Sequence, residues 1–171
     1  MQSLVEKLLA QARLENRVEI TPEAVRVDSL FTRLADARSA QLATKEIALT
    51  LQPASLYVKG DPDLLEQSLG NLLDNAIDFT PQGGSIELAA REEHGQIQLI
   101  VTDSGSGIPD YARDRIFERF YSLPRDNGVK SSGLGLAFVQ EVARLHQGEI
   151  TLRNRHEGGV MATLTLHRPF T

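Results

Sequence analysis

The sequence predicts an α+β fold, with one domain of ordinary size and a short helical segment before it. Strand patterns occur in consecutive pairs in the second half of the chain, and helices with one apolar face precede and separate them. The 171 residues, 41% hydrophobic and 24% charged, are typical of a globular domain that buries a substantial core.

The first helix is expected at residues 3–16, where apolar side chains recur at i, i+3, i+4 and i+7. A helix of this length is marginal alone, so we interpret it as the end of a longer helix. The boundary near Glu15 divides the chain into residues 1–17 and 18–171. The apolar stripe consists of Val5, Leu8, Leu9 and Ala12.

Short strands and two longer helices are expected next. Asp61 and Pro62 are residue types preferred at the N-cap and first position of a helix, which should end near Phe79. The other expected elements are a strand at 18–20, a helix at 27–44, and strands at 47–51 and 56–58.

The second half of the chain is expected to contain two β-hairpins. Between residues 121 and 132 the sequence is polar and lacks periodicity, so we expect a lid over a ligand there. The expected elements are strands at 86–91 and 97–102, a loop at 103–109, a short helix ending at Phe120, a helix at 134–146, and strands at 149–154 and 160–166.

The composition excludes several classes of function. The chain has no cysteine, which removes disulfides, thiolate catalysis and cysteine-based zinc sites and fits a reducing cytoplasm. A formal charge of −5 argues against a nucleic-acid surface. No apolar run approaches the ~18 residues of a membrane span, and no signal peptide begins the chain, so we expect no direct membrane contact.

Two asparagines mark the first candidate site, on the helix expected to end at Phe79. Asn71, Asn75 and Asp78 line up at i, i+4 and i+7, away from the apolar stripe. An asparagine oxygen could bind Mg²⁺, which prefers oxygen ligands completed by nucleotide phosphates. The alternative is that these are ordinary surface residues.

A glycine-punctuated loop follows an apolar strand and forms the second candidate site. Asp103 precedes Gly105 and Gly107, whose small size lets a ligand approach the backbone. A carboxylate at this position could accept a hydrogen bond from an exocyclic amine. A plain turn would explain the same residues.

A second glycine loop, from Ser131 to Leu136, begins an amphipathic helix. Backbone amides at a helix N-terminus bind anions, and glycine exposes them. The motif is neither a Walker loop nor a dinucleotide fingerprint, and the alternative is an ordinary helix start. The three motifs occur in one order over about 65 residues, which makes a chance arrangement improbable.

Together these motifs resemble those of the sensor histidine kinases. The run from Asn71 to Pro81 is similar to their asparagine box, Asp103 to Gly107 to the first glycine box, Ile116 to Phe120 to the phenylalanine box, and Gly133 to Leu136 to the second glycine box. Residues 12–15 resemble the end of their second dimerisation helix. The resemblance implies a two-layer α+β sandwich of the Bergerat ATP-binding type, with a mixed, mostly antiparallel sheet covered on one face by about three helices.

The resemblance also implies a role for each matching residue, with ATP and Mg²⁺ as cofactors. Asn75 would bind Mg²⁺, Asn71 would act at the phosphates, and Asp103 would accept the adenine amino group. Arg119 would contact the terminal phosphate, although it could instead be a solvated surface charge. The implied nucleotide-binding residues are Asn71, Asn75, Asp103, Gly105, Gly107, Ile108, Phe120, Lys130, Ser132, Gly133, Leu134, Gly135 and Leu136, and the implied catalytic residues are Asn71 and Arg119.

The chain departs from the family pattern on the phosphate side of the implied site. Asp78 stands where a lysine is common, Ser122 where an arginine is usual, and Ser131 where a glycine is usual. We expect Lys130 or Arg125 in the lid to supply the missing positive charge.

None of the four histidines suits phosphorylation, which requires a helical histidine followed by an acidic residue. His156 precedes Glu157, but two glycines follow where a helix is needed. The phosphoacceptor should therefore lie on a dimerisation domain outside this sequence, and this chain should not autophosphorylate alone. The resemblance further implies relay to an aspartate of a response regulator, a full-length homodimer, a fragment that can be monomeric, and a cytoplasmic position below an inner-membrane sensor.

Three other functions fit parts of the pattern. ATPases of the same superfamily usually carry a glutamate four residues before the Mg²⁺-binding asparagine, where this chain has Asn71, which cannot act as a base. Anti-sigma serine kinases commonly keep that acidic residue as well. A catalytically silent ATP-binding or docking module stays open because of Asp78, Ser122 and Ser131.

Overall fold

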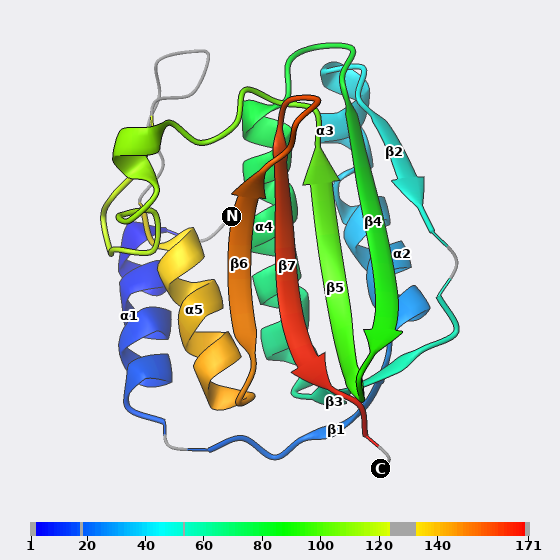
Figure 1. The fold of residues 1–171 in the computed structure, drawn as a ribbon. Helices are drawn as coiled ribbons and strands as arrows, with labels where there is room; N and C mark the ends of the chain where they lie inside the picture. The colour runs from blue at the N-terminus through cyan, green and yellow to red at the C-terminus, as the bar shows by residue number, and fades with distance from the viewer. Residues whose placement is uncertain (1–2, 18, 53, 124–132, 170–171) are drawn as a thin grey trace.

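The computed structural model describes residues 3–17, 19–52, 54–123 and 133–169 (Figure 1). Its elements follow the α+β order that the sequence predicts. They are α1 (Leu4–Glu15), β1 (Glu23–Arg26), α2 (Val27–Ala37), α3 (Ser39–Thr44), β2 (Ala48–Leu51), β3 (Tyr57–Gly60), α4 (Pro62–Phe79), β4 (Ser85–Glu93), β5 (Gln96–Asp103), the 3₁₀ turn η1 (Asp110–Ala112), α5 (Gly135–Leu145), β6 (Glu149–Asn154) and β7 (Val160–His167).

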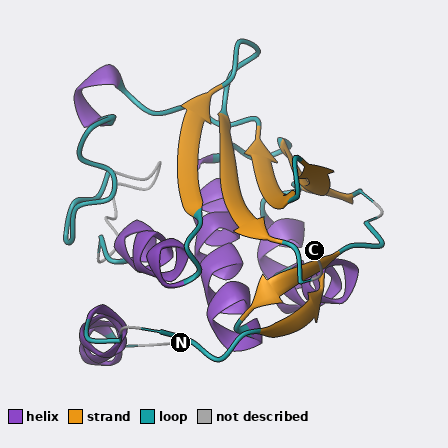
Figure 2. Ribbon diagram, turned by 60° about the horizontal axis from the view of Figure 1, so that its bottom comes forward, coloured by secondary structure: helices purple, strands orange, loops and turns teal. Residues whose placement is uncertain are grey.

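A five-stranded sheet forms one layer, in the order β2-β4-β5-β7-β6. The pair β2 and β4 is parallel, whereas the other neighbours are antiparallel. Helices α2, α4 and α5 cover one face of this sheet, and α1 lies beyond α5 at the edge (Figures 1 and 2). The mixed, mostly antiparallel sheet with helices on one face is therefore confirmed.

Helix α4 lies at the centre of the helical layer. Asp61 caps it as predicted, accepting hydrogen bonds from the backbone N–H groups of Asp63 at 3.0 Å and Leu64 at 3.1 Å. One face is buried against the sheet, and its polar residues Asn71 and Asn75 are only partly covered. The core between the layers includes Leu65, Leu69, Leu72, Leu73, Ile86, Leu88, Ile97, Leu99, Val101, Leu164 and Leu166.

The two hairpins are confirmed, and the first has a tight two-residue turn. Glu93 pairs with Gln96 at the end of β4 and β5, and His94 and Gly95 both have positive φ, at 53° and 79°. That combination is typical of a type I′ turn, whose twist matches that of the flanking strands. The second hairpin joins β6 to β7.

The single helix expected at 27–44 is wrong, because the chain breaks at Arg38. Its φ of −115° and ψ of 11° lie outside the helical range, and α2 and α3 are separate helices. The Arg38 guanidinium donates to Asp74 at 2.8 and 3.4 Å and to the Leu34 carbonyl at 3.3 Å. These contacts fix the break, after which α3 turns Leu42 into the core.

The strand expected at 18–20 is also misplaced. Val18 lies outside the described residues, and Glu19 and Ile20 belong to no strand. The strand is instead β1, which pairs antiparallel with β3 so that buried Val25 stands opposite buried Val58. The pairing partner, which the local pattern does not reveal, sets the position of this strand.

The short helix expected to end at Phe120 is reduced to the 3₁₀ turn η1 followed by irregular turns. Between residues 110 and 120 only Ala112 and Ile116 are buried, so the segment has little apolar surface to stabilise a helix. Within the parts of the chain that the structure describes, no helix has the length and apolar character of a membrane span.

Candidate functional site

A cleft of about 640 Å³ lies beside the C-terminal half of α4. A smaller pocket of about 70 Å³, with mostly apolar side chains, adjoins it. Five residues line both: Asn75, Phe79, Ile116, Leu123 and Leu136. The site is therefore bipartite, with a polar cleft that continues into an apolar pocket.

Asp103 lies in the apolar pocket, at the end of β5, and is only 7% exposed. Its Oδ1 accepts hydrogen bonds from the backbone N–H groups of Gly105 at 2.8 Å and Val160 at 3.1 Å. Burial raises the pKa of the carboxyl group, and these two bonds oppose that rise. Because both amides use Oδ1, the second carboxylate oxygen is the one that could accept from a ligand.

The loop after Asp103 is held very close to its neighbours. A Cβ atom on Gly105 would lie 2.4 Å from the Phe79 carbonyl oxygen, so only glycine fits there. Gly107 has a φ of 83°, and Ile108 lines the apolar pocket. The loop is therefore pressed against the end of α4, which brings the Asp103 carboxyl and Asn75 to one pocket.

Asn154 and Arg155, which the sequence patterns do not single out, hold this loop in place. Asn154 accepts from the Ile108 N–H at 2.7 Å through Oδ1 and donates to the Ile108 carbonyl at 2.8 Å through Nδ2. Arg155 donates to the Asp103 carbonyl at 2.9 Å. Both residues come from the end of β6 and the turn after it, about 50 residues from the loop, so no local signal could have identified them.

Asn71 connects α4 to the first turn of α5. Its Nδ2 donates to the Gly135 carbonyl at 3.2 Å. Asn71, Gly133 and Gly135 all line the polar cleft, as does the exposed Asp78. The asparagine helix and the second glycine loop therefore form adjoining walls of one cleft.

Gly133 is packed against the backbone of Phe120. Its carbonyl accepts from the Phe120 N–H at 2.9 Å, and a Cβ atom would lie 2.4 Å from the Phe120 carbonyl carbon. The two ends of the expected lid are thus joined at the cleft. Leu134 is buried as the N-cap of α5, and Lys130, Ser131, Ser132 and Arg125 lie outside the described residues.

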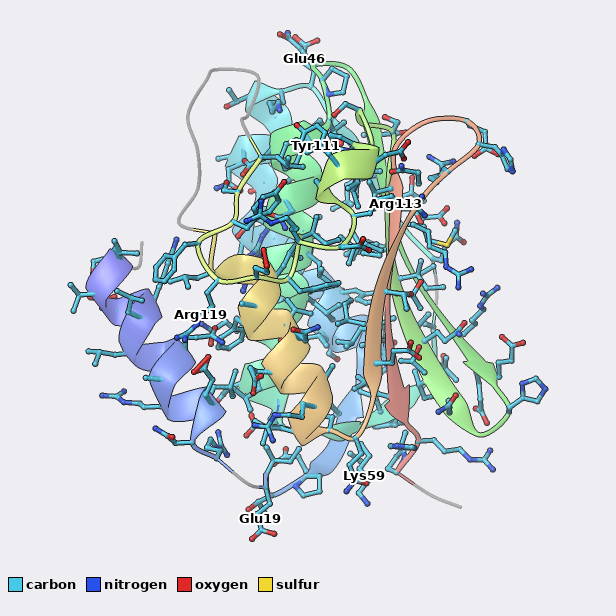
Figure 3. The ribbon with its side chains drawn as sticks, turned by 60° about the vertical axis from the view of Figure 1, so that its left-hand side comes forward. Glu19, Glu46, Lys59, Tyr111, Arg113 and Arg119 are labelled. Carbon is cyan, nitrogen blue, oxygen red and sulfur yellow. The ribbon has the colours of Figure 1, made fainter. Side chains whose placement is uncertain are left out.

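Arg119 and Phe120 do not line the cleft in this structure. Phe120 is 59% exposed, with a positive φ of 67°. The Nη1 atom of Arg119 lies 3.5 Å from Oε1 of Glu15, on the side of the molecule where α1 faces α5 (Figure 3). The Arg119 side chain therefore points toward α1. The aromatic and apolar side chains that line the cleft are those of Tyr121, Ile116 and Leu123.

The sequence and the fold both match known proteins. The family described as "Histidine kinase-, DNA gyrase B-, and HSP90-like ATPase" matches residues 60–169. Sensor protein CreC of Escherichia coli K12 is 64% identical over 171 residues, which are 100% of this chain and 36% of that protein. Sensor-like histidine kinase SenX3 of Mycolicibacterium smegmatis is 32% identical over 167 residues, 95% of this chain and 44% of that protein. The chain thus spans less than half the length of these relatives.

A solved structure agrees with these matches. Full-length ShkA in complex with AMPPNP superposes with a TM-score of 0.84 at 27% sequence identity, over 98% of this chain and 36% of that one. The likeness covers the sheet, the helical layer and the first helix alike, since almost the whole chain is included.

Proposed function

Because the chain belongs to the family of histidine kinase-, DNA gyrase B- and HSP90-like ATPases, we propose that it transfers the γ-phosphate of Mg-ATP to a histidine outside its own sequence. Within that family it is a catalytic ATP-binding domain of the sensor histidine kinase type, so the resemblance carried by its motifs is confirmed. We also propose that the acceptor histidine relays the phosphoryl group to an aspartate of a response regulator. The domain would then lie in the cytoplasm below a membrane sensor.

The observation that carries the proposal is the bipartite site. An adenine ring suits the apolar pocket, where the Asp103 carboxylate can accept from the exocyclic amino group. A polyphosphate suits the adjoining cleft, where Gly133 and Gly135 stand at the start of α5. ShkA, whose fold the chain shares, was solved in complex with AMPPNP, an ATP analogue, which supports nucleotide binding by this domain.

The cleft contains an oxygen ligand of the type that Mg²⁺ prefers. Asn75, which lines both parts of the site, offers an amide oxygen, and the nucleotide phosphates would provide further oxygen ligands. When bound, Mg²⁺ would neutralise charge that develops on the transferred phosphoryl group. Asn71 keeps α5 against α4 through Gly135, and an amide at that position offers no base for water, which favours transfer over hydrolysis.

We propose that residues 1–17 belong to the second dimerisation helix and that residues 18–171 form the catalytic domain. Helix α1 contacts the domain through α5, with Leu14 buried and the Arg144 guanidinium 3.3 Å from the Arg17 carbonyl. On α1, Leu4, Val5 and Leu9 stay exposed, as expected of a helix that packs against other helices of a dimer.

The test combines this chain with a separate dimerisation domain that carries the acceptor histidine, in Mg-ATP labelled at the γ-phosphate. We expect labelled phosphohistidine on the second protein, at a rate that Asn75→Ala lowers by at least about 100-fold, as for loss of a group essential to charge stabilisation. Asn16→Ala, at the C-cap of α1, is the matched control and should leave transfer intact. Tight ATP binding without transfer would instead support a catalytically silent module.

A further inference from the structure

The polar cleft contains carboxylates close to where a polyphosphate would have to lie. Asp74 and Asp78 both line it, beside Asn75. Arg38 pairs with Asp74 at 2.8 Å, and Asp78 lies at the exposed surface in the last turn of α4. If the proposed function holds, a bound nucleotide adds several negative charges next to these groups. A cationic side chain close to the phosphates would therefore favour binding, in addition to the proposed Mg²⁺.

Lys45 is held at this wall of the cleft by hydrogen bonds of both its side chain and its backbone carbonyl. Its Nζ donates to the carbonyl oxygens of Ile77 at 2.8 Å and Asp78 at 3.3 Å, the final residues of α4 before Phe79. Its own carbonyl accepts from the Gly83 N–H at 2.9 Å. The side chain is half-buried and lines the cleft.

We propose that Lys45 is the cation that binds the phosphate chain of the nucleotide in this cleft. An ammonium group has three donors, and the two carbonyls of α4 use two of them. The third can reach a phosphate oxygen while the other two keep the group in place. The charge also offsets Asp78, whose backbone it contacts. Lys45 thus offers a positive charge of the kind expected from Lys130 or Arg125, which lie outside the described residues.

Lys7 is the other lysine that lines the cleft in the described part of the chain. It comes from α1, which we assign to the dimerisation region, and so its position depends on how that helix docks. Lys45 instead bonds to α4, the helix that carries Asn71 and Asn75. Because Lys45 bonds to the helix that carries both asparagines, the distance from its ammonium group to them does not depend on how α1 docks. This favours Lys45 over Lys7 as the phosphate ligand.

A purely structural role would explain the same two hydrogen bonds. A cation at the C-terminus of a helix satisfies its last carbonyls and interacts favourably with the helix dipole. That role predicts a loss of stability that does not depend on the nucleotide. Phosphate binding predicts a loss of affinity that grows with the number of phosphates, and the two are separable by experiment.

The experiment measures the dissociation constants of ATP, ADP and AMP with Mg²⁺ by titration calorimetry, and the Tm of each free protein. The variants are Lys45→Met, which keeps the apolar stem, Lys45→Arg, which keeps the charge, and Lys7→Met. Lys59→Met is the matched control, because Lys59 lies at the opposite end of the molecule from Glu46, the residue after Lys45 (Figure 3). We expect Lys45→Met to weaken ATP binding about tenfold and AMP binding less than about twofold.

Lys45→Arg should restore most of the ATP affinity, and Lys59→Met should change none of the three constants. An unchanged ratio of ATP to AMP affinity in Lys45→Met, with a lower Tm, would overturn the proposal and leave only a helix cap. A phosphate-dependent loss in Lys7→Met alone would also overturn it and assign the cation to α1. A wild-type chain that binds no nucleotide would overturn the proposed function and this inference with it.

Discussion

Asp103→Asn separates ligand recognition from folding, because the two carboxylate oxygens have different tasks. Oδ1 accepts from the amides of Gly105 at 2.8 Å and Val160 at 3.1 Å. The amide oxygen of asparagine can accept both bonds in its place, so the loop should keep its conformation. The side-chain NH₂ group then replaces the second carboxylate oxygen and presents a donor to the adenine amino group, which is also a donor.

The size of the effect follows from these contacts. A hydrogen bond to a charged group is worth about 1.5–3 kcal/mol, so ATP affinity should fall about 10- to 150-fold in Asp103→Asn. Stability should change little. In Asp103→Ala, by contrast, two part-buried amides lose their acceptor at about 1–3 kcal/mol each, which lowers Tm by about 4–24 °C in a chain of this size.

The assay compares ATP with inosine triphosphate, which has a carbonyl oxygen where ATP has the amino group. Asp103→Asn should shift the affinity ratio towards the inosine nucleotide, since its NH₂ can donate to that oxygen. Asp36→Asn, an exposed carboxylate on α2 with the same change in charge, is the control. Unaltered ATP affinity in Asp103→Asn, or no shift in the ratio, would refute the assignment of the purine to this pocket.

Three further results are expected. Burial lowers the pKa of His146 below its ordinary 6.5, so the unfolded state binds the proton first and the stability of the fold decreases as the pH drops through 6.5. The urea midpoints at pH 7.5 and 5.5 should therefore differ less in His146→Gln than in the wild type. Asn154→Ala removes two exposed bonds to the glycine loop, so calorimetry should show ATP affinity down about threefold to tenfold while Tm changes by only about 2–4 °C. Gly105→Ala, whose Cβ would lie 2.4 Å from a backbone oxygen, should lower Tm, whereas Gly135→Ala, with its nearest neighbour at 3.9 Å, should not; equal melting curves would contradict the steric argument.

His146 has its pH effect because both ring nitrogens are engaged in a buried site. Nε2 accepts from the Asp61 N–H at 3.0 Å, and Nδ1 lies 2.7 Å from the Val142 carbonyl oxygen. This arrangement requires the neutral ring with its proton on Nδ1. Protonation of Nε2 would place a donor against the Asp61 amide and add a charge to a side chain that is largely buried.

Elements with a strong local signal were predictable from the sequence. Helix α4 has its first-position proline and its apolar period within 18 residues and its cap directly before them, and the hairpins have alternating strands around turn residues. The candidate residues Asn75, Asp103 and Ile108 could also be found, because their motifs are compact. The break at Arg38 could not, since it depends on a contact with Asp74, which lies 36 residues further along the chain.

The sequence by itself determined that this chain is an α+β domain with an asparagine helix and two glycine loops in the order of the sensor histidine kinases. Those features depend on periodicity, capping and glycine, whose effects reach only a few residues along the chain. Only the tertiary structure decided that Asn154 holds the first loop, that Arg119 faces Glu15, and that Lys45 joins the wall of the cleft. Each of these contacts joins side chains or backbone from distant segments, so its position follows from the packing of the helical layer on the sheet and not from any local pattern.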